Sequence, residues 1–264
     1  MPSPDEGSNP SLGPGPESSS RVPRARLDEI STAWSRIRDP LHFITRYGPA
    51  LRRYLRAIIP DEQEGEDILQ ALALRVLERG FERATPERGR FRDYLRVSAR
   101  NAALSRLKAR SRSKPAAEAL DRLEATGPDA DPFAAAERAW LDEWRRGILD
   151  RAWRALEAHE SRTPGNLFHT VLRLSVDHGD EPSDALAARC SRLAGRPLRP
   201  DAFRKQLSRA RRRFAKLVVD EVKLDLADPS PDRVEEELVE TGLMEHVRDF
   251  LPPDWRTKGF GDPE

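Results

Sequence analysis

The chain has 264 residues, of which 38% are hydrophobic and 34% are charged, and its formal net charge is +1. That hydrophobic fraction is low for one large core, so we expect small modules joined by solvated segments. No apolar stretch is long enough to span a bilayer and residues 1–20 lack the pattern of a secretory signal, so no membrane partner is expected. Cys190 is the only cysteine, which excludes an internal disulfide and is typical of a reducing cytoplasm.

The charges are sorted along the chain into blocks of opposite sign. Residues 88–114 hold ten Arg or Lys against one acid, and residues 196–216 hold nine against one. Residues 116–137 hold six acids against one base, and residues 220–254 hold twelve against three. Two basic blocks that alternate with acidic blocks indicate two polyanion-binding surfaces. Solvated helix faces with no ligand would give the same composition.

The first half of the chain is predicted to hold one helical domain, residues 25–114. Residues 1–24 are rich in Pro, Gly and Ser and are predicted to be disordered. A short helix is expected at 27–37 and a polar loop at 81–89. Three amphipathic helices follow from apolar residues at three- and four-residue spacing; they lie at 41–59, between Pro60 and Gly80, and at 91–107.

The second half is predicted to be helical as well. Residues 115–131 hold prolines, a glycine and many acids, so they are predicted to form an acidic linker. A domain at 132–226 is expected to hold a long helix from about Pro132 and helices at 167–174, 184–194 and 201–226. An acidic tail, 227–264, is expected to hold one short helix at 233–251. With no strand alternation, the predicted fold class is all-α: two small helical modules joined by the linker.

The helices on either side of residues 195–200 form a helix-turn-helix pattern, a short helix followed by a basic one. Such a motif places the start of its second helix in the major groove, and Pro200 suits a first helical turn because it lacks an N–H. There Arg204, Lys205 and Gln206 could reach base edges, and Arg209, Arg211 and Arg212 could reach phosphates. An ordinary helical hairpin with a wet basic face is the alternative.

A second basic segment, residues 91–110, interleaves aromatic side chains with arginine. Such a surface suits stacking of unpaired bases along a nucleic-acid backbone. The alternative is that Phe91 and Tyr94 anchor the core of a small bundle, and for Phe91 the core position is favoured.

Three segments resemble, in family order, parts of the sigma-70 family of RNA polymerase sigma factors. Residues 88–95 with 99–101 look like the promoter-melting part of region two, and residues 66–77 look like its polymerase-binding helix. Residues 203–214, which include Ser208, resemble the recognition helix of region four. The resemblance spans about 41–224 and is closest to the extracytoplasmic-function group. The acidic tail is similar to tails on some planctomycete-type members.

The resemblance implies a non-enzymatic initiation factor that tethers core RNA polymerase to promoter DNA and traps unpaired bases. It implies that Asp67, Gln70 and Arg75 dock on the polymerase. The 81–90 loop, which includes Arg88 and Arg90, would form with Ser98 and Asn101 a pocket for a base flipped from the minus-ten element. The adjacent backbone would be held by Arg100, Arg106, Lys108 and Arg110. The helix from Asp201 would read the minus-thirty-five element, and the linker would follow the RNA exit path.

The sequence departs from the family pattern at Ala71, Tyr94 and Ser105, and its 194–200 turn is several residues longer than usual. The alternative function is a stand-alone helix-turn-helix regulator, or a helical adaptor, that does not use polymerase. An anti-sigma factor or other regulator is a further implied partner. No cofactor or metal is expected, because the histidines and Cys190 lack ligand spacing and no Gly-rich phosphate loop is present.

The acidic tail has two interpretations. Its apolar stripe could complete the core of the second module. Alternatively, residues 228–251 could pack on a neighbour and present acids to the basic face of residues 204–216, where they would compete with promoter phosphates.

Overall fold

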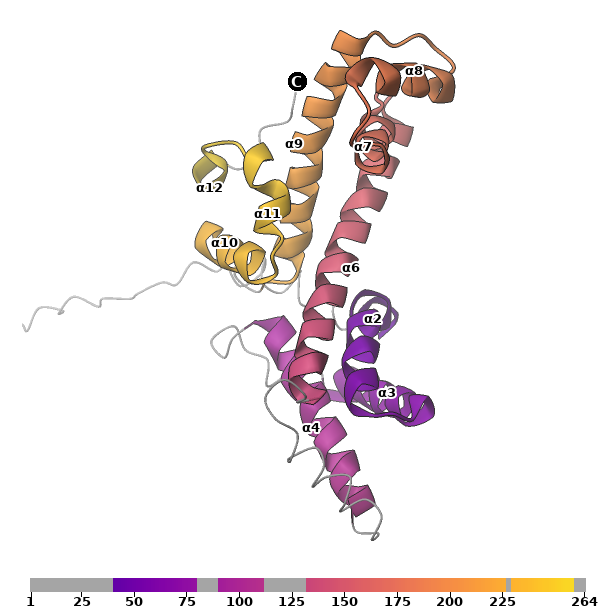
Figure 1. The fold of residues 1–264 in the computed structure, drawn as a ribbon. Helices are drawn as coiled ribbons and strands as arrows, with labels where there is room; N and C mark the ends of the chain where they lie inside the picture. The colour runs from indigo at the N-terminus through magenta and orange to yellow at the C-terminus, as the bar shows by residue number, and fades with distance from the viewer. Residues whose placement is uncertain (1–39, 80–89, 112–131, 227–228, 259–264) are drawn as a thin grey trace, which may run out of the picture.

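The computed structural model describes residues 40–79, 90–111, 132–226 and 229–258 (Figure 1). The predicted helix at 27–37, the loop at 81–89, the linker at 115–131 and the disordered segment at 1–24 lie outside the described residues. Within the described ranges every regular element is a helix, which confirms the all-α fold class. None of the described helices combines the length and hydropathy that a membrane span requires.

The helices match the predicted order. The described elements are α2 (Pro40–Ile58), α3 (Glu62–Arg79), α4 (Phe91–Ser111), α6 (Pro132–Arg162), α7 (Phe168–Asp177), α8 (Ser183–Ala194), α9 (Pro200–Leu224), α10 (Pro231–Glu240), α11 (Met244–Val247), the 3-10 turn η2 (Arg248–Phe250) and α12 (Trp255–Lys258). Local chemistry sets several boundaries. The Asp61 carboxylate caps α3 by accepting hydrogen bonds from the backbone N–H groups of Gln63 and Glu64, and Pro200 occupies the first turn of α9.

Helix α6 is the spine of the molecule (Figure 1). It has 31 residues, so its axis is about 46 Å long. Helices α2, α3 and α4 lie around one end of it, α7 and α8 lie at the other end, and α9 runs back alongside it. Its buried side chains recur every four residues, at Trp140, Trp144, Ile148, Ala152 and Leu156. Because four residues turn an α-helix by about 40° more than a full turn, this buried stripe winds slowly around α6 from one group of neighbours to the other.

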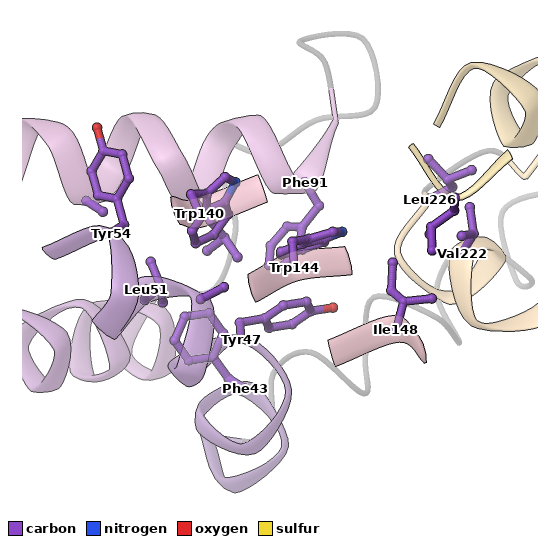
Figure 2. Close-up of a cluster of buried hydrophobic side chains, with 14 of the residues drawn as sticks. Phe43, Tyr47, Leu51, Tyr54, Phe91, Trp140, Trp144, Ile148, Val222 and Leu226 are labelled. Atoms are coloured by element: carbon purple, nitrogen blue, oxygen red, sulfur yellow. The ribbon is translucent and has the colours of Figure 1, made fainter. Parts of the chain in front are cut away.

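The first hydrophobic core lies between α2, α3, α4 and the first part of α6, and the C-terminal half of α9 closes it (Figure 2). Its centre is aromatic: the Tyr47 ring stacks on Trp144 at 5.4 Å between centroids and meets the edge of Phe91 at 5.0 Å. Phe91 is 2% exposed, so the structure places it in the core, as the sequence favoured. Ile148, Val222 and Leu226 extend the same cluster toward the tail.

The second core is smaller and occupies the opposite end of α6. Side chains of α7, α8 and the N-terminal half of α9 pack around Leu156, with Phe168, Cys190 and Phe203 among the buried members. Helices α6 and α9 therefore each contribute to both cores. The first core therefore contains residues from both sides of the predicted domain boundaries at 114, 132 and 226. Those boundaries themselves remain a prediction.

The tail supplies the first core with apolar side chains. Val234, Leu238, Leu243, Met244 and Val247 are all buried in it. The prediction of one continuous helix at 233–251 was wrong, because α10 ends at Glu240 and α11 begins at Met244. Between them Gly242 has a φ of +69°, and a Cβ there would lie 2.9 Å from a nitrogen of Arg145. Glycine relieves both constraints, so the chain reverses at this point.

A buried polar network joins α2, α6 and α9. Arg46 donates from Nε to Asp225 and from Nη1 to Glu221, both at 2.9 Å. Arg151 donates to the same Glu221 oxygen at 2.8 Å, and the Tyr47 hydroxyl donates to Asp225 at 2.8 Å. Burial and the neighbouring Asp225 carboxylate raise the pKa of Tyr47 well above its ordinary value, so the hydroxyl keeps its proton and remains a donor.

We expect this network to be a point of high sensitivity to mutation. Asp225→Ala should lower the free energy of unfolding by about 3–5 kcal/mol, because it leaves the charge of Arg46 buried without its partner. Asp220→Ala removes a partly exposed ion pair with Lys216 from the same helix and should cost no more than about 1 kcal/mol. Urea denaturation followed by circular dichroism measures both. An equal decrease in the free energy of unfolding for the two variants would show that the buried network contributes no more to stability than an exposed ion pair.

Candidate nucleic-acid interface

The predicted polymerase-binding residues Asp67 and Gln70 lie on the exposed side of α3. The carboxylate of Asp67 accepts a hydrogen bond from Gln63 at 3.2 Å. Leu74, one and two turns further along this face, is 56% exposed, although the sequence analysis did not single it out. Its position off the Ile68–Leu72 stripe was the available signal, since residues three, four and seven apart share a helix face.

Arg75 lies at the edge of that face, and its side chain lines a small cavity between α3 and α4. The cavity has a volume of about 40 Å³ and is also lined by Tyr94 and Ser98 of α4 and by apolar side chains of α2 and α3. Arg75 was predicted to contact polymerase and Ser98 to contact a flipped base. The structure brings these two residues together and separates Arg75 from the open Asp67–Gln70 surface.

One face of α4 carries the residues predicted to capture a base. The predicted residues Ser98 and Asn101 share this face with Tyr94, at spacings of three and four; Tyr94 and Ser98 are half-buried and Asn101 is exposed. Val97 is 50% exposed beside them. Arg100 lies off this face, with its guanidinium 4.8 Å from the centroid of the Phe133 ring. An aromatic ring, an apolar side chain and an amide on one accessible face can stack on a base and donate to its edge.

The end of α4 is tied to the start of α3. Arg106 and Arg110 donate to the two oxygens of Glu64 at 2.7 and 2.9 Å, while Glu64 itself is only 8% exposed. Their own side chains remain about half exposed. These arginines therefore have a structural partner that a phosphate would have to share or replace. Lys108 is exposed on the same helix, and Arg88 lies outside the described residues.

Arg90, by contrast, is covered. Its guanidinium forms ion pairs with Glu236, Glu237 and Glu240 of α10, and its side chain is 15% exposed. Arg92, which is not among the predicted DNA-binding residues, pairs with Glu237 at 3.2 Å and Glu240 at 3.0 Å.

The buried Glu237 and the half-exposed Glu240 of this cluster differ in their pKa values. Burial raises the pKa of Glu237 above its ordinary range in spite of both arginines. At Glu240 burial acts in the same direction and is the largest single influence, but the hydrogen bonds and charges of Arg90 and Arg92 together outweigh it and lower the pKa. The carboxylate of Glu240 is therefore the more firmly charged partner of Arg90.

The connection between α8 and α9 is well ordered by hydrogen bonds. Gly195 ends α8 in the left-handed region at a φ of +63°. The Leu198 N–H donates to the Ser191 hydroxyl at 2.8 Å, and Arg196 donates to the carbonyl of Gly165 at 2.8 Å. These contacts fix how α9 leaves the turn.

Five of the seven predicted DNA-binding residues of α9 share one exposed stripe, which comprises Arg204, Lys205, Ser208, Arg209 and Arg212. Gln206 and Arg211 lie outside it and are half-buried. The guanidinium of Arg211 lies 5.5 Å from the Phe250 ring and donates to Ser175 at 3.3 Å. The sequence carried a signal for this separation, because Arg211 follows the core-facing Leu207 by four residues and precedes Phe214 by three.

The α9 stripe and the α4 face lie near opposite ends of the α6 spine (Figure 1). Of the two interpretations of the tail, its apolar stripe does pack into a core, the first one, together with the C-terminal half of α9. The carboxylates of the tail pair with Arg90 and Arg92 at the start of α4, whereas the expectation was the basic face of residues 204–216. On that face the contact between Arg211 and Phe250 joins helix and tail.

Residues 43–113 match the family model described as Sigma-70 region 2. The matched segment contains α2, α3 and α4, and therefore both the Asp67–Gln70 surface and the α4 face. No curated protein and no solved structure matches the chain. Residues 43–113 are therefore similar to sigma-70 region 2, and the match does not extend to the rest of the chain.

Proposed function

We propose that the chain is a sigma factor of the extracytoplasmic-function group that directs core RNA polymerase to promoters and opens them. The observation that carries this proposal is the region 2 match at 43–113, within which the faces suited to polymerase and to unpaired DNA are exposed. Sigma-70 factors are not enzymes, so binding energy alone would drive melting. The acidic tail beyond the two-module plan supports a planctomycete-like member, and a cytoplasmic location follows from the partner.

In the proposed complex α3 contacts the polymerase. Asp67 and Gln70 supply polar groups, and Leu74 supplies an exposed apolar side chain next to them. An apolar centre with polar groups around it is the usual composition of a protein interface. Arg75, which lines the cavity with Ser98, is better placed to support the DNA-facing side.

The α4 face captures an unpaired base of the minus-ten element, in this proposal. Base stacking on Tyr94 and Val97, with hydrogen bonds from Asn101 and Ser98, would offset part of the cost of unpairing. The α9 stripe reads the minus-thirty-five element, because its five residues reach solvent together from the helix start that follows the turn.

A second candidate function is a helix-turn-helix regulator that acts without polymerase. One observation favours it: the α9 stripe is exposed while Arg90 and Arg92 of α4 are covered by α10. In this arrangement α9 alone could bind DNA. Binding of core polymerase separates the two candidates, and an anti-sigma factor is a partner for the first candidate only.

The polymerase-binding proposal predicts the effect of two surface changes. Asp67→Arg combined with Leu74→Gln should reduce co-purification with core polymerase by at least about tenfold, since central interface residues commonly contribute 1–2 kcal/mol or more. Both side chains are exposed, so helicity should not change. Glu157→Arg reverses an exposed charge outside region 2 and should leave core binding intact. Undiminished binding by the double variant would favour the regulator that acts alone.

The α9 stripe predicts a change in the salt dependence of DNA binding. Arg209→Ala with Arg212→Ala should lower the slope of log K against log salt by about 2 units, because each lost phosphate contact removes about 0.9. Arg138→Ala, an exposed arginine of α6, should leave the slope unchanged. Fluorescence anisotropy on duplex DNA, with the free chain and with the polymerase complex, measures these slopes. The same decrease in all variants would assign no DNA contact to the stripe.

The base-capture proposal concerns Asn101. Asn101→Ala should reduce transcription from a closed duplex about tenfold, corresponding to the loss of 1–2 kcal/mol of base contact, and should have much less effect on a template already melted at the minus-ten site. Ser105→Ala is the control, because that hydroxyl already donates to the carbonyl of Asn101 at 2.8 Å. An equal loss on both templates would contradict a role in capture.

A further inference from the structure

Helix α10 places a row of carboxylates on the start of α4. Glu236, Glu237 and Glu240 lie within one turn of each other and face two guanidinium groups, those of Arg90 and Arg92. Arginine pairs with carboxylate and phosphate through the same forked geometry. The acidic face of α10 therefore presents to this arginine pair the chemistry that a nucleic-acid backbone would present.

The position of α10 is held from its other side. Val234 and Leu238 are fully buried in the first core. Beyond the helix end, Arg145 of α6 donates to the carbonyl of Thr241 at 2.6 Å, and the Thr241 hydroxyl donates to the carbonyl of Glu237 at 2.6 Å. These contacts show that α10 has a defined seat, independent of its ion pairs with α4.

The three glutamates that pair with Arg90 differ in how far they are exposed to solvent. Glu237 is 2% exposed, whereas the side chains of Glu236 and Glu240 are about half exposed. Exposed ion pairs contribute little net stability and weaken with salt. Solvent and salt reach the carboxylates of Glu236 and Glu240, although Arg90 and Arg92 themselves are only 15% and 8% exposed. A competing polyanion can therefore displace these carboxylates if its phosphates take their place at the arginines, while the apolar side of α10 remains packed.

The arginine pair lies in region 2 and immediately precedes the α4 face of Tyr94, Ser98 and Asn101. A DNA strand that placed a base on this face would bring its phosphates toward Arg90, four residues before Tyr94. The buried Arg92 lies on another side of α4 and is linked to Arg90 through their shared partner Glu240. Among the described residues, the tail contacts Arg211 of α9, which lies outside the α9 stripe. Within the described part of the chain the tail therefore covers Arg90 and Arg92 beside the α4 face and forms no ion pair with the α9 stripe.

We propose that α10 is an intramolecular competitor for nucleic acid at Arg90 and Arg92. DNA phosphates displace Glu236 and Glu240 when a strand engages α4, so strand capture in the free chain is restrained while α9 remains available. This regulatory role rests on the proposed function for the identity of the strand, but the competition itself requires only a nucleic-acid backbone.

The test neutralises the outer carboxylates. Glu236→Gln with Glu240→Gln in the full chain should raise affinity for a short single-stranded DNA oligonucleotide about three- to tenfold, measured by fluorescence anisotropy. The matched control is Glu245→Gln with Asp249→Asn, which makes the same charge change at exposed tail positions away from α4. The control should change affinity less than twofold. An equal gain in the control would overturn the proposal, because it would show a general charge effect.

A double-mutant cycle ties the gain to its site. In an Arg90→Gln background the gain from the two glutamine substitutions should largely disappear. A gain of undiminished size would overturn the proposal. Thermal melts of each variant establish that the chain remains folded, which is expected since Glu236 and Glu240 are half exposed.

Hydrogen exchange supplies an independent measurement. Backbone amides of residues 231–240 should exchange faster when the oligonucleotide binds the wild-type chain, because local opening of α10 no longer has to break its ion pairs with α4, even though its apolar side stays packed. Strand binding with no change in α10 exchange would contradict displacement.

Core polymerase binding separates failure of this inference from failure of the proposed function. If no variant binds polymerase but the glutamine gain persists, the sigma function fails and the competition stands. If polymerase binding and promoter-dependent transcription are intact but the glutamine variant gains no affinity, the competition fails alone.

Discussion

The pairing of Arg46 and Arg151 with Glu221 and Asp225 determines how the rest of the molecule is assembled. Two positive and two negative groups are brought out of water at the junction of three helices, α2, α6 and α9. Such a group of charges is tolerable only if every member keeps its partner, because an unpaired buried charge costs several kcal/mol. The three helices therefore have one permitted arrangement, in which the end of α9 meets the middle of α2.

The location of the tail follows from that arrangement. Helix α9 has 25 residues, so it carries the chain about 37 Å away from its turn. The tail consequently begins beside the first core, and α10 reaches α4. The opposite charges of the tail and the basic blocks were visible in the sequence, but proximity along the chain pointed to residues 204–216. The folded distance was set by the length of α9 and by contacts such as Arg46–Asp225, whose members are 179 positions apart.

Periodicity predicted the helices because each has an apolar face to bury. It could not predict what buries that face, so the sharing of α6 and α9 between two cores had no signal in the sequence. The same limit applies to the candidate site. The exposure of Asp67 and of the α9 stripe follows from their positions on a helix. The partial burial of Arg211 could be predicted in the same way. The covering of Arg90 depends on a partner about 150 residues away, which no local pattern encodes.

The α6 spine also acts as a ruler between the two candidate DNA surfaces. Its length of about 46 Å equals the rise of roughly 14 base pairs of B-form duplex at 3.4 Å per pair. While α6, α9 and α2 remain joined, this length limits the separation of DNA contacts that one chain can make at its two ends. If the two surfaces bind DNA as proposed, sites set further apart could be engaged together only if the first core opened between α2 and α6, and the ion pairs of Arg46 with α9 lie at that junction.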